Sequence, residues 1–226
     1  MFLPMASNAI ASPDTSSCLI LFPPTCTTNV FSNAPSSVQL VPIDKLQFVD
    51  ADLLRRNANA MKEIGYVKVG DNDLFDKLPF GKMDDNLQDT NFRVSLSEII
   101  QNNFQLGKFQ GSAAIDEITI THDYSLNDIA FLKVREISYL MHSNTLDLPH
   151  EMINRVVAGL PAILVARASG VNGKAITALQ WANDSKLYSL ELYELQRDPK
   201  RELKLLKTAH AISMLHTGKM GNAVLK

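Results

Sequence analysis

The chain has 226 residues, of which 46% are hydrophobic and 20% are charged, and this composition is sufficient for one globular core. A formal net charge of −2 gives no basic surface for nucleic acid or anionic lipid, so we predict no nucleic-acid partner. No run reaches the ~18 consecutive apolar residues of a membrane span. The nearest run, residues 18–22, is stopped by Pro23 and Pro24, and we predict no transmembrane segment.

Residues 1–40 are rich in Ser, Thr, Pro, Ala and Asn, and no Lys or Arg precedes Lys45. The apolar start at residues 1–5, followed by the small-residue site Ala9-Ile10-Ala11, resembles the end of a secretory signal. The alternative is a disordered arm. We therefore expect a disordered or processed N-terminal segment.

The two cysteines, Cys18 and Cys26, both lie in this segment. Two nearby thiols with no others in the chain fit a local disulfide in an oxidising compartment, and equally fit two idle thiols. Together with the signal-like residues, they favour an extracytoplasmic or secreted location, with the cytoplasm as the alternative. Two ligands without a nearby histidine cannot fill a zinc site.

From residue 41 the composition becomes that of a globular domain, which we place at residues 41–216, before a flexible tail at 217–226. Asp50 can cap a helix whose apolar face ends at Ile64 before Gly65. A strand near 66–69 and a loop-rich segment follow. Ser95-x-x-Glu98 has the form of a capping box, which predicts that a second helix begins at Ser95 and closes at Gly107.

Apolar residues then alternate from Ile115 to His122, which predicts a strand. We expect a turn at 123–128 and a strand at 129–139, in which Ile129, Phe131, Ile137 and Tyr139 share one face. Residues 147–160 fit either a short helix or a strand that enters a hairpin at Gly159.

The last third predicts strands at 163–168, 174–181 and 187–193, separated by Gly- and Asn-containing turns. Asp198 and Pro199 then open a helix whose buried face contains Leu205, Leu206, Ala209 and Ile212. Strands in hairpin succession with helices before and after them predict an α+β fold. We expect an antiparallel sheet of about five strands, with helices on one face and the C-terminal helix closing the fold.

Few residues indicate chemistry, and no cofactor is predicted. No phosphate-binding glycine motif, His-Glu-x-x-His or nucleophile elbow occurs. Read as a calcium loop from Asp71, the acidic stretch at 71–89 lacks the required Gly and Glu. Trp181 and Tyr188 are candidates to line a ligand cleft between sheet and helix, although core packing is the more frequent role for such residues.

The spacing of Gly159, Ala162, Trp181 and Tyr188, with the apolar face of the last helix, resembles a bacterial extracytoplasmic domain of unknown function. Domains of this kind occur in anti-sigma-factor-associated proteins and sporulation-type lipoproteins. The resemblance covers residues 113–214. It implies a fold and a compartment, and it brings no catalytic residues.

These observations favour a non-enzymatic, extracytoplasmic binding domain that engages a protein or a cell-envelope component. One alternative is a carrier of a small molecule or lipid, with Trp181 and Tyr188 at its cleft. The other is an enzyme with a dispersed site that uses His122 and the acidic stretch at 71–89.

Overall fold

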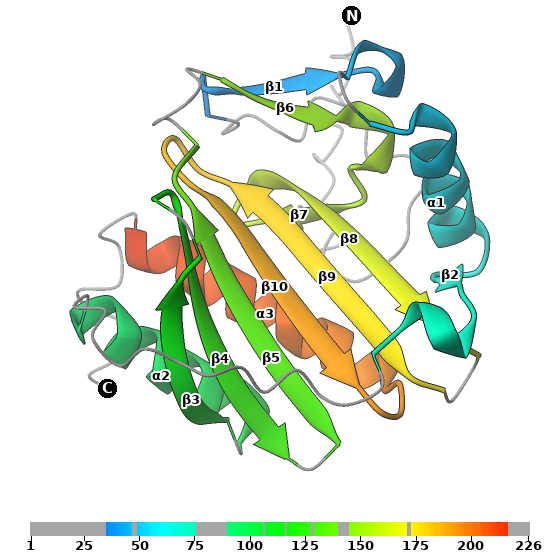
Figure 1. Cartoon of the computed structure of the whole chain (residues 1–226). Helices are drawn as coiled ribbons and strands as arrows, with labels where there is room; N and C mark the ends of the chain where they lie inside the picture. Colours follow the sequence, from blue (N-terminus) through cyan, green and yellow to red (C-terminus); the bar gives the residue numbers. More distant parts are fainter. Residues whose placement is uncertain are drawn as a thin grey trace, which may run out of the picture.

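The computed structural model describes residues 35–46, 49–75, 90–105, 107–115, 117–127, 129–139, 145–170 and 173–216. Its main element is a sheet of eight strands in the order β2-β8-β9-β10-β5-β4-β3, with β7 beside β8 (Figure 1). The strands are β2 (Val67–Lys68), β3 (Lys108–Ala114), β4 (Thr119–Asn127), β5 (Ala130–Ile137), β7 (Arg155–Val157), β8 (Leu160–Ala168), β9 (Ala175–Ala182) and β10 (Leu187–Glu194). β2 pairs with β8 in parallel, and the other pairs are antiparallel. The fold is α+β as predicted, but the sheet is mixed and has more than five strands.

Two helices, α2 (Thr90–Phe104) and α3 (Pro199–His216), cover one face of this sheet, and α3 follows the last strand as predicted (Figure 1). The residues between them and the sheet form the larger hydrophobic core. Leu96 and Ile100 of α2 and Leu205, Ala209 and Ile212 of α3 are all fully buried. We call the opposite face of the sheet, which is turned toward the viewer in Figure 1, the front face.

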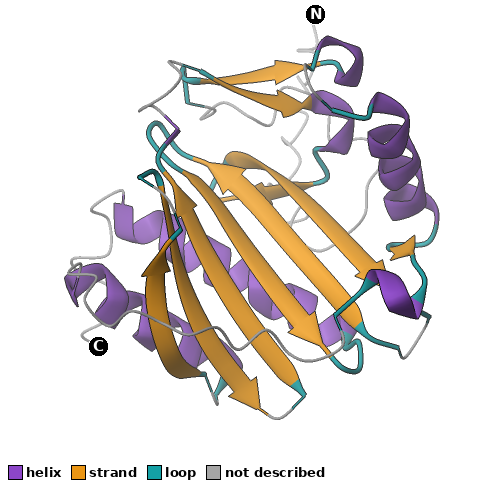
Figure 2. Cartoon of the chain, viewed as in Figure 1, coloured by secondary structure: helices purple, strands orange, loops and turns teal. Residues whose placement is uncertain are grey.

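A smaller layer covers one end of the front face (Figure 2). It contains α1 (Ala51–Glu63), the short helical turns η3 (Ile43–Lys45) and η6 (His150–Met152), and a parallel pair of strands, β1 (Val38–Val41) and β6 (Leu146–Pro149). Its apolar side chains pack on Ile163 and Ala182 of the front face. The predicted placement of all helices on one face therefore holds for α2 and α3 but not for α1.

Helices α1 and α3 begin where the capping residues in the sequence predict. Asp50 accepts a hydrogen bond from the Leu53 amide at 2.9 Å at the start of α1, and Asp198 accepts one from the Lys200 amide at 3.0 Å. These side chains satisfy amides that the first helical turn leaves without an internal partner. The prediction that Ile64 belongs to the buried face of α1 is wrong, because Ile64 lies just beyond the end of the helix and is 55% exposed.

Other predictions in the middle of the chain are wrong. α2 begins at Thr90, so Ser95 lies inside the helix and does not cap it. β4 runs through Asp123 to Asn127, where a turn was expected. By contrast, the strand predicted at 129–139 does form, as β5; its residues in phase with Phe131 face forward, and the alternate set Ala130, Leu132 and Val134 faces the helices.

The hairpin alternative is confirmed at Gly159. β7 and β8 are joined by Ala158 and Gly159, whose φ angles are 51° and 82°. Two successive residues with positive φ form the type I′ turn that suits a tight hairpin. Within residues 147–160, for which the sequence also allowed a short helix, only the three-residue helical turn η6 forms.

Candidate functional site

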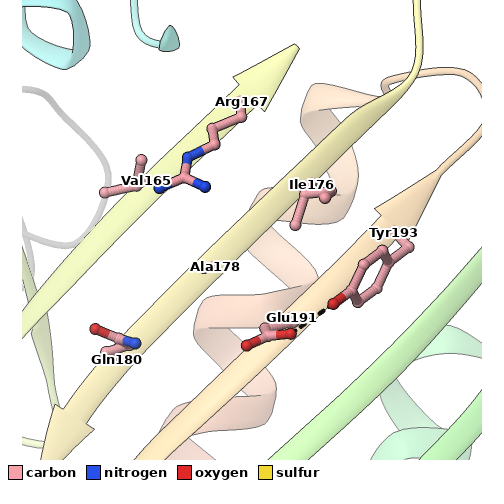
Figure 3. A pocket seen from close by; sticks show the side chains of 7 residues that line it. All are labelled: Val165, Arg167, Ile176, Ala178, Gln180, Glu191 and Tyr193. Atoms are coloured by element: carbon pink, nitrogen blue, oxygen red, sulfur yellow. Dashed lines mark hydrogen bonds between the residues drawn. The ribbon is translucent and has the colours of Figure 1, made fainter. Parts of the chain in front are cut away.

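The front face carries a shallow pocket of about 260 Å³ over strands β8, β9 and β10 (Figure 3). It is lined by Val165, Arg167, Ile176, Ala178, Gln180, Glu191 and Tyr193. Every one of these residues lies on a regular strand, so the alternation of side chains along each strand is what brings them to the same face. The pocket borders the smaller layer, because Val165 also packs against that layer.

A small side chain at the centre produces the hollow. In the strand register Ala178 lies between Val165 of β8 and Glu191 of β10. Larger side chains surround this alanine (Figure 3), and its small methyl group leaves room for the pocket between them. Val165, Ile176 and Ala178 together make an apolar floor, whereas Arg167, Gln180, Glu191 and Tyr193 supply polar groups around it.

One wall of the pocket is a fixed hydrogen-bonded group. The Tyr193 hydroxyl donates to Oε2 of Glu191 at 2.7 Å, and Arg135 donates to the same oxygen at 3.2 Å. Burial and the adjacent Glu191 raise the pKa of Tyr193, so its hydroxyl keeps its proton and stays a donor. Rings pack around Tyr193, with Phe75 at 5.6 Å and Phe131 at 6.1 Å between centroids. This wall is therefore held in place before any ligand arrives.

The other polar groups of the pocket are unengaged. Arg167 and Gln180 are exposed, and neither makes a hydrogen bond or ion pair within the described part of the chain. Oε1 of Glu191 likewise has no partner there, because both bonds to this carboxylate use Oε2. Donors and an acceptor thus point toward an apolar floor, which is the arrangement typical of small-molecule sites.

Beside the pocket, the front face contains a group of buried polar atoms without partners. Among the described residues, no hydrogen-bond partner lies near either carboxylate oxygen of Asp123, Nε of Arg135 or Oγ of Ser189. Asp123 is 1% exposed, and the nearest cation, Nζ of Lys133, is 4.0 Å away. Burial raises the pKa of Asp123 to about 6, although Lys133 and Arg135 act in the opposite direction. Such atoms are rare in folded proteins, and they mark this part of the sheet as unusual.

A second polar network lies on the helix-facing side of the sheet. His122 is within hydrogen-bonding distance of Ser112 Oγ (2.7 Å, through Nδ1) and of Glu136 Oε1 (3.1 Å, through Nε2). Lys186 donates to the other Glu136 oxygen at 2.7 Å. Burial would raise the pKa of Glu136, but the hydrogen bonds from His122 and Lys186 outweigh it and the pKa is lowered. The serine, histidine and glutamate are each less than 5% exposed. We interpret this network as a structural link between β3, β4, β5 and the start of β10.

Trp181 and Tyr188 lie on the helix-facing side, not in the pocket. Their rings are stacked, with centroids 5.2 Å apart and planes at 17°, and both residues are 0% exposed. Burial raises the pKa of Tyr188, and the charge of Glu136 acts in the same direction. The pair fills the core beneath α2 and α3.

The dispersed site of the enzyme alternative does not come together in the part that the structure describes. His122 is on β4, whereas Asp71 and Asp73 form the helical turn η4 after β2, and four strands lie between β2 and β4 in the sheet. Asp73 binds the Gly70 amide at 3.0 Å. The rest of the acidic stretch, Cys18, Cys26 and the tail at 217–226 lie outside the described residues.

The pocket residues were not found from the sequence, although one signal was present. Glu191 and Tyr193 alternate with Leu190 and Leu192 in β10, so the sequence places them on the face away from the helices. Nothing in the sequence shows which residues of β8 and β9 stand beside them. That information lies in the register between strands.

No protein-family model, curated protein or solved structure matches this chain. The resemblance of residues 113–214 to an extracytoplasmic domain therefore stays a prediction. Within the described ranges no helix is long and apolar enough to cross a membrane. No group of three or more His, Cys, Asp or Glu residues in those ranges could hold a metal ion.

Proposed function

We propose that this protein is a non-enzymatic binding domain whose ligand is a small molecule held in the front-face pocket. The observation that carries the proposal is the hollow over Ala178, where groups of Arg167, Gln180 and Glu191 that have no partner among the described residues surround an apolar floor. A cavity of about 260 Å³ suits a metabolite-sized ligand. The proposal keeps the non-enzymatic binding role, but it adopts the small-molecule carrier that was the alternative to a protein or cell-envelope partner. It also moves the carrier cleft to the opposite face of the sheet.

The positions of the buried histidine network and of the pocket, on opposite faces of the sheet, support a binding role over catalysis. The Ser112–His122–Glu136 network, which has residue types used in nucleophilic catalysis, is buried against the helices. The pocket lies on the other face, and the described residues that line it include no histidine, serine or cysteine. An extracytoplasmic or secreted location remains part of the proposal, on the basis of the N-terminal residues and the resemblance.

The test is a ligand screen with a variant that fills the pocket. The full chain is screened against a metabolite library by thermal shift, and hits are confirmed by isothermal titration calorimetry. Ala178→Phe should abolish binding, because the phenyl ring occupies the space over the floor. Ala113→Phe is the matched control: it makes the same change on the same face, on β3, with β10, β5 and β4 lying between β3 and β9.

A hit that binds the wild type and the Ala113→Phe variant but not Ala178→Phe supports the proposal. A ligand that binds Ala178→Phe as tightly as the wild type would place the site elsewhere and refute it. Absence of any hit across the library also counts against it. Tryptophan fluorescence is a poor readout here, since Trp181 is buried on the far side of the sheet.

A further inference from the structure

The pocket presents two opposite charges to the same hollow. Arg167 extends from β8 and Glu191 from β10, and in Figure 3 their charged ends lie on either side of β9. Since neighbouring strands are about 4.8 Å apart, the two backbones are separated by roughly 10 Å. The structure shows no ion pair between the two side chains, so each keeps at least one group for another partner.

The two charges differ in how firmly they are held. Glu191 is bound through Oε2 by Arg135 and Tyr193, which fixes the carboxylate and leaves Oε1 as an acceptor. Arg167 is exposed and has no partner in the described ranges, so its guanidinium can adjust to a ligand. A guanidinium binds a carboxylate through two parallel hydrogen bonds, and a carboxylate oxygen accepts a strong hydrogen bond from an ammonium group.

We infer that the ligand is a zwitterion with an apolar side chain, of the free amino-acid type. Its carboxylate would bind Arg167, its ammonium group would bind Oε1 of Glu191, and its side chain would rest on Val165 and Ile176. The amide of Gln180, at the rim of the same hollow, can donate to or accept from either polar group. This inference rests on the proposed function and specifies its ligand class.

A ligand with only one charge fits the pocket less well. A simple acid would satisfy Arg167 but bring its carboxylate toward Glu191, whereas a simple amine would satisfy Glu191 but approach Arg167. Like charges brought together at a binding site select against the wrong partner. The opposed pair should therefore discriminate by charge pattern, and the apolar floor should discriminate by side-chain type.

The experiment compares three molecules that share one skeleton. Phenylalanine, 3-phenylpropionate (which lacks the amine) and 2-phenylethylamine (which lacks the carboxylate) are titrated into the full chain by calorimetry. Leucine, 4-methylpentanoate and 3-methylbutylamine form a second series. We expect at least one of the two amino acids to bind with an affinity about tenfold or more above both of its truncated analogues, because each lost charge contact is worth at least this factor.

Arg167→Gln should weaken the binding of that amino acid about tenfold and leave the binding of its amine analogue unchanged or stronger. Arg56→Gln, on the exposed side of α1, is the control for loss of one positive charge. Glu191→Gln should weaken binding of the amine analogue and leave that of the acid analogue unchanged or stronger. Circular dichroism checks that each variant is folded, because Glu191 belongs to the fixed wall.

Two results would overturn the inference. One is equal binding of an amino acid and its acid or amine analogue, and the other is no binding by leucine or phenylalanine. In either case the proposed function still stands if the metabolite screen finds another ligand that Ala178→Phe excludes. The proposed function itself fails only if that screen yields no such ligand, so the two failures can be told apart.

Discussion

The buried carboxylate of Asp123 makes the stability of this protein depend on pH in a direction that can be tested. Burial raises its pKa from 3.8 to about 6, and neither oxygen has a hydrogen-bond partner in the part of the chain that the structure describes. The folded state therefore holds this proton more tightly than the unfolded chain does. The resulting stabilisation is fully present below about pH 4 and is lost as the pH rises through about 6.

The size of the effect follows from the shift. A change from 3.8 to about 6 corresponds to roughly 3 kcal/mol, of which about 2 kcal/mol is lost between about pH 4.5 and about pH 7.5. Asp123→Asn removes the titrating group while keeping nearly the same shape. Relative to the wild type, the variant should therefore become more stable by about 2 kcal/mol as the pH rises over this interval.

Urea unfolding followed by circular dichroism at the two pH values measures this difference. Asp147→Asn, at an exposed position on β6, controls for the loss of one carboxylate. The comparison between variant and wild type cancels the titration of all other groups. If the free-energy difference between Asp123→Asn and the wild type is the same at both pH values, the reasoning about burial of Asp123 is wrong.

Three further changes test the structure. Arg201→Met removes the cation that pairs with the 1%-exposed carboxylate of Glu194 and leaves it only the hydrogen bond from the Asp198 amide. This variant should lower the unfolding free energy by about 3 kcal/mol, measured by urea unfolding; an unchanged value would show that the pair adds nothing. His122→Leu leaves its serine and glutamate neighbours short of a partner and should cost about 2 to 3 kcal/mol while ligand binding persists; lost binding with full stability would instead favour a direct role for the imidazole. Ala158→Asn suits the positive φ of 51° in the Ala158-Gly159 turn and should stabilise the chain by about 0.5 to 1 kcal/mol in thermal unfolding; a destabilised variant would contradict the turn assignment.

Where a signal acts over only a few residues, the sequence predicts the elements well. Asp50 and Asp198 begin α1 and α3 as expected, and the strands at 163–168, 174–181 and 187–193 match β8, β9 and β10 closely. A cap acts on amides one turn away, and alternation acts between adjacent residues, so both can be read without a fold.

The sequence predictions fail where the local signals are weak or ambiguous. β3 has the sequence Lys-Phe-Gln-Gly-Ser-Ala-Ala, whose small residues have little preference for strands, and it forms because β4 offers an edge. Ser95 has the residues of a capping box, but α2 continues through it back to Thr90. In β5 apolar residues lie on both faces, Phe131 on one and Leu132 and Val134 on the other, so alternation alone does not show which face packs against the helices.

The sequence by itself determined the α+β class, helices α1 and α3 and the closing series of hairpins, because caps and periodicities act over a few residues. The parallel pairs β1–β6 and β2–β8 and the layer over the front face were decided only in the tertiary structure. The pocket, too, was decided only in the tertiary structure. Arg167, Ala178 and Glu191 meet only because three strands align in one register, and register is set by long-range pairing that no single segment encodes.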